Sequence, residues 1–124
     1  MAIEVQDTTI DAVKGEVNQY DLDANIALVA GSDQIWFTVK KQKSDTDASA
    51  VVKKGLNVPT LSGIVVTSEP NGTFRVTLDR ADLLNVTERA LLYDCKVKVA
   101  ASGVIQTVTS GVMLLADSIN KDAA

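Results

Sequence analysis

The sequence predicts an all-β domain, folded as an antiparallel sandwich of about seven to nine strands or as a near-closed barrel of the same strands. Val, Ile and Thr together make up 35 of the 124 residues, and their branched side chains suit a pleated sheet better than a helix. Several short segments alternate between apolar and polar residues, as half-buried strands do. No segment sustains the helical apolar period long enough to form a packed helix.

The expected elements follow one another with short connections. A turn is expected at Lys14-Gly15, a loop over residues 55–62, and one helical turn capped by Asp79 over residues 79–84. The short segment at residues 50–54 is expected to lie at a sheet edge, where its lysines discourage pairing with other chains. The strands are expected at residues 8–13, 16–22, 34–41, 50–54, 63–68, 73–78, 91–99, 104–109 and 111–116.

The alternation is clearest in the strand expected at residues 34–41. Ile35, Phe37 and Val39 fall on one face, and Trp36 falls on the other. Residues 91–99 repeat the pattern and place Cys95 among inward apolar side chains. We therefore expect these apolar faces to build the core and Trp36 to point away from it.

A hairpin is expected over residues 63–78. Asn71-Gly72 separates two β-rich segments, and both residue types tolerate the positive φ angle of a tight hairpin turn. In the second strand of this hairpin, Arg75 alternates with apolar residues. Arg75 is therefore expected to face outward.

Charge and composition argue against several classes of function. The formal net charge of −4 and a pI near 4.7 speak against a nucleic-acid partner, which normally needs a basic surface. No apolar stretch approaches the roughly 18 residues of a membrane span. The first residues show no signal peptide, and a single cysteine, Cys95, allows no internal disulfide. These features are typical of folding in a reducing cytoplasm.

Motifs for catalysis, cofactors and metals are missing from the sequence. Because the chain contains no histidine, it can hold no Ser-His-Asp triad, and its cysteine has no imidazole base. Residues 21–25 imitate the start of a calcium loop, but Ile26 and Ser32 replace the Gly and Glu that such a loop needs. Asp45 and Asp47 are interpreted as carboxylates of a solvated loop. We expect a protein without enzymatic activity, cofactor or metal.

Two outward-facing residues are candidates for an interface, Trp36 and Arg75. An exposed Trp36 would suit a protein interface, where aromatic residues anchor binding, or a platform for a sugar ring. The alternative is that a neighbouring segment of the same domain covers Trp36.

Four segments occur in an order that resembles small virion proteins of tailed phages. They are Asp33-Gln-Ile-Trp-Phe-Thr-Val-Lys-Lys41, Gly72-Thr-Phe-Arg-Val-Thr-Leu78, Tyr93-Asp-Cys-Lys-Val97 and Gly103-Val-Ile-Gln-Thr-Val-Thr-Ser-Gly111. In this order the chain is similar to the immunoglobulin-like N-terminal domain of phage baseplate upper proteins. One departure is Arg89-Ala-Leu-Leu, where members of that family often have a Gly-Tyr-Tyr-like entry to the strand.

The resemblance implies an immunoglobulin-like β-sandwich over residues 8–116, with an N-terminal extension or edge strand at residues 1–7 and a flexible tail at 117–124. It implies a structural component of the virion, made in the host cytoplasm and located in the tail, the baseplate or the head surface. The expected partners are other virion proteins and copies of the chain itself, and residues 1–7 could bind a partner by strand addition. The second hypothesis is a carbohydrate-binding module that holds particles to surface glycans.

Overall fold

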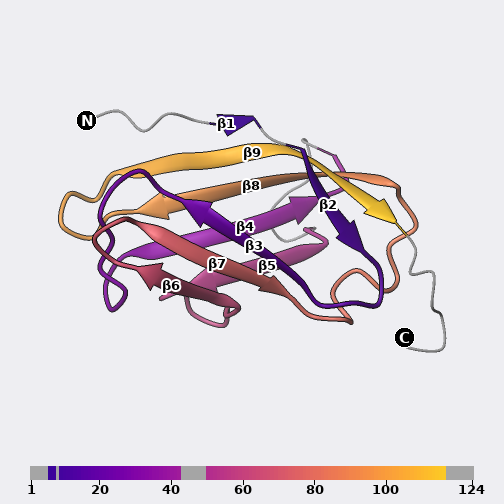
Figure 1. The fold of residues 1–124 in the computed structure, drawn as a ribbon, viewed down its shortest axis with the longest axis horizontal. Helices are drawn as coiled ribbons and strands as arrows, with labels where there is room; N and C mark the ends of the chain where they lie inside the picture. Colours follow the sequence, from indigo (N-terminus) through magenta and orange to yellow (C-terminus); the bar gives the residue numbers. More distant parts are fainter. Residues whose placement is uncertain (1–5, 8, 43–49, 117–124) are drawn as a thin grey trace.

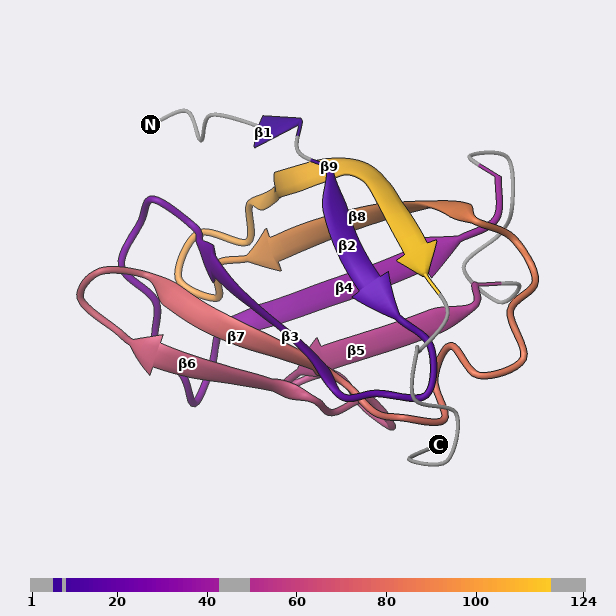
Figure 2. The same ribbon diagram turned by 45° about the vertical axis from the view of Figure 1, so that its right-hand side comes forward.

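The computed structural model describes residues 6–7, 9–42 and 50–116. These residues form two facing β-sheets and contain no helix (Figure 1, Figure 2). The strands are β1 (Gln6–Asp7), β2 (Ile10–Val13), β3 (Asn18–Asp23), β4 (Gln34–Lys40), β5 (Val52–Leu56), β6 (Ile64–Ser68), β7 (Thr73–Leu78), β8 (Ala90–Lys98) and β9 (Ile105–Ala116).

The two sheets form a β-sandwich, so the predicted all-β fold class is confirmed. The larger sheet, called sheet A, has the order β1-β9-β8-β4-β5, and β2 also pairs with β9. The smaller sheet, called sheet B, has the order β3-β7-β6. In the lettering used for immunoglobulin domains, sheet A would contain strands G, F, C and C′ as β9, β8, β4 and β5, and sheet B would contain strands B, E and D as β3, β7 and β6. The first two strands depart from the antiparallel prediction, because β1 and β2 run parallel to β9.

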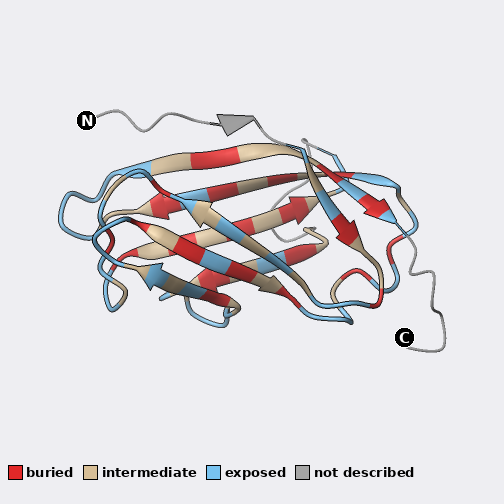
Figure 3. Cartoon of the chain, viewed as in Figure 1, coloured by how far each residue is buried: buried red, intermediate tan, exposed pale blue. Residues whose placement is uncertain are grey.

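The core lies between the sheets and contains the apolar faces that alternation predicted (Figure 3). Val99 was also expected to face inward but is only half-buried, at the margin of this core. The predicted side chains that are buried are Ile35, Phe37 and Val39 of β4, Phe74, Val76 and Leu78 of β7, Leu91, Tyr93, Cys95 and Val97 of β8, and Met113 and Leu115 of β9.

Three aromatic rings connect the sheets through this core. Phe37 of β4 stacks on Tyr93 of β8 with ring centroids 5.7 Å apart, and on Tyr20 of β3 with centroids 6.1 Å apart. Such stacked pairs add to the free energy gained from burial alone. The hydroxyl of Tyr20 also donates a hydrogen bond to the carbonyl oxygen of Asp11, 2.8 Å away, and so ties β3 to β2.

The predicted hairpin is confirmed as β6 and β7, but its turn differs from the expected one. The loop is four residues long, residues 69–72, and follows a register shift between Val66 and Ser68. Only Gly72 has a positive φ, 72°, and its N–H donates to the carbonyl oxygen of Ser68 over 2.9 Å. A four-residue loop needs the left-handed conformation at one position, so Asn71 does not share it.

The structure corrects the helical turn expected at residues 79–84. This segment forms successive turns with hydrogen bonds between residues three apart. The carboxylate of Asp82 accepts the N–H of Asp79 over 2.6 Å, and the carboxylate of Asp79 itself lies 3.5 Å from the ammonium of Lys54. A segment this short gains too few hydrogen bonds to offset the cost of nucleating a helix.

Several strand boundaries differ from the prediction by one or two residues, and two of these differences change an expected connection. β5 extends to Leu56, so Gly55 belongs to a strand and not to the loop expected over residues 55–62. β9 runs from Ile105 to Ala116 as one curved strand (Figure 2), and Gly111, at φ 153°, lies inside it and does not end it. A glycine inside a strand often marks a bend.

The ends of the chain are described only in part. Of the predicted N-terminal strand, Gln6 and Asp7 pair with Thr109 and Ser110 of β9. The predicted tail at residues 117–124 lies outside the described residues, as do Asp45 and Asp47.

Candidate interaction surfaces

Trp36 lies on the outer face of sheet A, opposite the buried face of β4, and is half-buried. The register places it between Gly55 of β5 and Lys96 of β8. A Cβ at Gly55 would come within 2.8 Å of the Cβ of Leu61 and 3.2 Å of that of Val58. The connection between β5 and β6 therefore covers the strand next to Trp36, and the indole keeps part of its surface exposed.

A shallow hollow of about 390 Å³ lies on the same outer face as Trp36. Leu92 of β8 and Val112 of β9 face each other in register and supply its apolar part. Polar side chains from three strands complete the lining, namely Thr38, Lys40, Asp94 and Ser110. Apolar surface framed by polar and charged groups is the usual composition of a protein interface.

Sequence reasoning missed the apolar part of this hollow. The alternation that places Leu91 and Tyr93 in the core also places Leu92 on the opposite face, so this signal was present in the sequence. The position of Val112 beside Leu92 depends on the register between β8 and β9, which alternation does not give.

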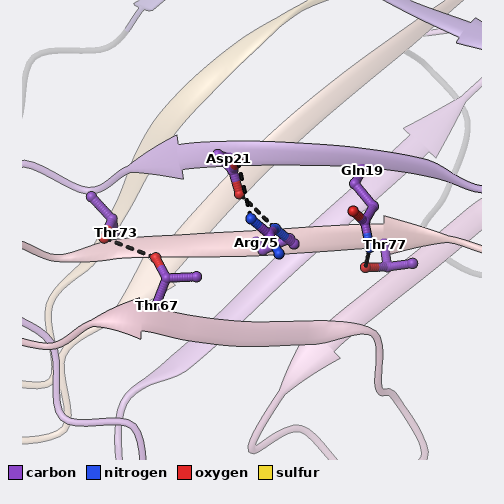
Figure 4. A network of polar contacts seen from close by, with 6 residues as sticks. All are labelled: Gln19, Asp21, Thr67, Thr73, Arg75 and Thr77. Atoms are coloured by element: carbon purple, nitrogen blue, oxygen red, sulfur yellow. Dashed lines mark hydrogen bonds and ion pairs between the residues drawn. The ribbon is translucent and has the colours of Figure 1, made fainter.

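Arg75 lies on the outer face of sheet B, where it forms an ion pair within the chain (Figure 4). Its Nε lies 2.8 Å from Oδ1 of Asp21, which is directly opposite on β3, and its Nη2 lies 3.5 Å from Oδ2. The hydrogen bond from Arg75 lowers the pKa of the Asp21 carboxyl, and the same bond raises the pKa of Arg75. Both side chains remain exposed, so screening by solvent keeps this pair weak.

Two further polar pairs lie on this face of sheet B (Figure 4). The hydroxyls of Thr67 and Thr73 are 2.9 Å apart, and Gln19 Nε2 lies 3.5 Å from the hydroxyl of Thr77. Cross-strand pairs of this kind are typical of a solvated sheet face. The structure thus gives Arg75 a partner within the chain, and its role in an interface stays a prediction.

A second hollow, of about 370 Å³, opens between β3 and β9. Tyr20 and Tyr93 line it together with apolar residues that include Ile10 and Val108. Burial raises the pKa of Tyr20 to about 12, and the charge of Asp11 and the neighbouring Tyr93 add to the shift. The phenol is therefore neutral at physiological pH and acts as a hydrogen-bond donor.

The remaining residues considered for chemistry have structural roles. Cys95 is buried in the core, and this burial raises the pKa of its thiol, with the charge of Asp94 adding to the effect. In the calcium-like segment, Oδ1 of Asp23 accepts the N–H of Asn25 over 2.7 Å, and Asn25 has a positive φ of 59°. The segment is thus a local turn closed by its own carboxylate.

Within the described ranges, no three Asp, Glu, Cys or His side chains gather as metal ligands would. The same part of the chain contains no helix that is long and apolar enough to cross a membrane. No family model matches the sequence, and a search of curated proteins finds no significant relative.

Proposed function

We propose that this protein is a non-enzymatic structural component of a tailed bacteriophage particle, acting through protein–protein assembly in the tail, the baseplate or on the head surface. The observation that carries the proposal is the outer face of sheet A, where the half-buried Trp36 shares a face with the hollow formed by Leu92 and Val112.

The segments that resemble virion proteins contribute directly to this face. Three of the four segments contain β4, part of β8 and part of β9, which are adjacent strands of sheet A. They supply six of the residues around the hollow, namely Thr38, Lys40, Tyr93, Asp94, Ser110 and Gly111. The resemblance and the candidate surface thus involve the same strands.

The chemistry of this face supports binding to a protein. A partner that covers Leu92 and Val112 removes apolar surface from water, which contributes roughly 25 cal/mol for each Å² buried. Trp36 provides an aromatic anchor of the type that dominates interface energies. Lys40 and Asp94 lie at the same hollow with opposite charges and can fix the orientation of the partner.

The test is incorporation into particles. Particles from a host that expresses the chain are purified on a density gradient, and the chain is quantified by mass spectrometry. We expect the wild-type chain to travel with the particles and Leu92→Asp, which places a charge in the hollow, to reduce its amount at least about tenfold. The matched control Val65→Asp changes an exposed valine of sheet B and should leave incorporation unchanged. Absence of the wild-type chain from the particles would refute the proposal.

A carbohydrate-binding adhesion module is the second candidate. The partial exposure of Trp36 on a sheet face favours it, because an indole ring offers a flat apolar platform to a sugar. A glycan-array signal that is lost in Trp36→Ala and kept in Val65→Asp would support this function. An array without signal for the wild-type chain would rule it out for the glycans displayed.

A further inference from the structure

We infer that two copies of this chain associate through one end of the sandwich, called here the loop end, which consists of residues 24–32 and 99–105. This inference rests on the proposed assembly function and adds the surface and the partner. The two segments connect β3 to β4 and β8 to β9, and they lie at the same end of the molecule (Figure 1).

The loop end is apolar and carries no charged residue. Charged residues make up 23% of the chain, yet residues 24–32 and 99–105 contain none. Val29 is 56% exposed, Val104 45% and Ile105 57%. The opposite end exposes Val17 and Leu84 as well, but charged residues surround them in the sequence. Exposed apolar side chains without charges between them indicate a surface that another surface covers.

Hydrogen bonds from the backbone to Asp33, and from Asn57 to the backbone, hold the two segments of the loop end in place. Asp33 is 3% exposed, and its two carboxylate oxygens accept the N–H groups of Val29 and Ala100, each over 2.9 Å. The side-chain amide of Asn57 donates to the carbonyl oxygens of Ala30 and Asp33 over 2.8 and 2.9 Å. A surface fixed in advance loses little conformational entropy when it binds.

Two exposed carboxylates at the margin of the loop end accept backbone N–H groups from it, and one of them is Asp23, whose Oδ1 accepts the N–H of Asn25 over 2.7 Å. Oε2 of Glu69, in the loop between β6 and β7, accepts the N–H of Ala30 over 2.9 Å. The backbone carbonyl of the same residue accepts the N–H of Leu28 over 2.8 Å. Both carboxylates are thus bonded to the backbone of the loop end at its margin.

A second copy is the partner that fits this surface. The chain has a net charge of −4, so two copies that approach through charged faces repel each other. The residues of the loop end themselves carry no charge, while Asp23, Glu69 and Lys98 border it, and an apolar surface is chemically complementary to itself. A two-fold contact that uses the same patch on both copies is the commonest arrangement of homo-oligomers. We expect a small interface and therefore weak association, with a Kd on the order of micromolar or above.

The test measures self-association of the purified full chain by sedimentation velocity over a series of concentrations. We expect a monomer–dimer equilibrium whose Kd rises at least about tenfold in Val29→Asp and in Ile105→Asp, because each buries a charge in the contact. The control Val65→Asp alters a residue that is 65% exposed on β6 and should leave the Kd unchanged. Fluorescence of Trp36 during urea unfolding verifies that all three variants fold.

Each contrary outcome overturns the inference. A chain that stays monomeric at all concentrations, or an equal loss of association in all three variants, shows that the loop end does not bind a second copy. If the chain is monomeric and Ile105→Asp abolishes its incorporation into particles, the loop end binds another virion protein. If the chain is monomeric and binds phosphatidylcholine vesicles, the loop end binds a lipid surface. Because self-association uses the purified chain alone, its failure is distinguishable from failure of the particle assay.

Discussion

Replacing Gly72 by alanine tests how the β6–β7 loop and the loop that follows β3 support each other. Gly72 has a φ of 72°, and a Cβ added to it would overlap the backbone carbonyl oxygen of Ile26. The two loops are also joined by hydrogen bonds. The N–H of Ala24 donates to the carbonyl oxygen of Gly72 over 2.9 Å, and that of Leu28 donates to Glu69 over 2.8 Å.

The expected loss of stability has two parts. A left-handed φ costs an alanine about 1–2 kcal/mol relative to glycine. Relief of the overlap moves the backbone around Ile26 and disturbs the two hydrogen bonds between the loops, each worth about 0.5–1.5 kcal/mol. Together these give a loss of about 2–5 kcal/mol in the free energy of unfolding. This is a large share of the roughly 5–15 kcal/mol by which a domain is stable.

Gly103→Ala is the matched control for this prediction. Gly103 has almost the same φ, 73°, but a Cβ there would meet no heavy atom within 4 Å, so only the conformational cost of about 1–2 kcal/mol applies. Urea unfolding followed by the fluorescence of Trp36, the single tryptophan, measures both variants. Equal losses of stability in the two variants would show that the loops do not support each other, and would refute the reasoning.

Three further predictions concern buried and paired groups. Asp33→Ala should lower the free energy of unfolding by about 2–4 kcal/mol, because two loop N–H groups lose a charged acceptor. Asp33→Asn should lower the free energy of unfolding by less, and urea titration compares the two variants. The pKa of Tyr20 should be about 12 in the folded chain, against 10.0 for a free tyrosine, and phenolate absorbance can follow this ionisation. The contribution of Tyr20 to the free energy of unfolding is therefore complete below pH 10 and is lost as the pH rises toward 12. The pKa of the Asp21 carboxyl should lie below its usual range, and its contribution to the free energy of unfolding should be lost as the pH falls through that lowered pKa. NMR titration should show that the pKa of Asp21 returns to its usual range in Arg75→Ala.

Much of the fold could be predicted from the alternation of side chains, because the pleat of a strand fixes that period. The inward faces of β4 and β7 follow directly from it, with Phe37 and Phe74 fully buried. The parallel pairing of β1 and β2 with β9 could not be predicted, because alternation sets the face of a strand and not its neighbour. The turn at Gly72 was located correctly, but the length of its loop depends on the register shift in β6.

The candidate surfaces were harder to predict, since they combine residues that are distant in the sequence. Alternation placed Trp36 on the outer face, but the segment that covers its neighbour Gly55 comes from the later connection around Leu61. The pairing of Arg75 with Asp21 needs the register between β3 and β7. The absence of charge from the loop-end segments is visible in the sequence, whereas their proximity follows only from the topology.

The two proposed surfaces lie far enough apart for one chain to use both at once. In the register of β8 and β9, Leu92 lies opposite Val112 in the hollow, and Ile105 of the loop end lies opposite Lys98, which borders the loop end. Six residues of strand separate these positions, a distance of about 20 Å. A dimer joined at the loop ends would therefore present two copies of the sheet A face to a particle, and its avidity would exceed the affinity of one copy. Ile105→Asp should then weaken particle binding and leave the single-copy contact intact, whereas Leu92→Asp should remove binding altogether. Particle titrations that find the two variants equally impaired would argue against two separate surfaces.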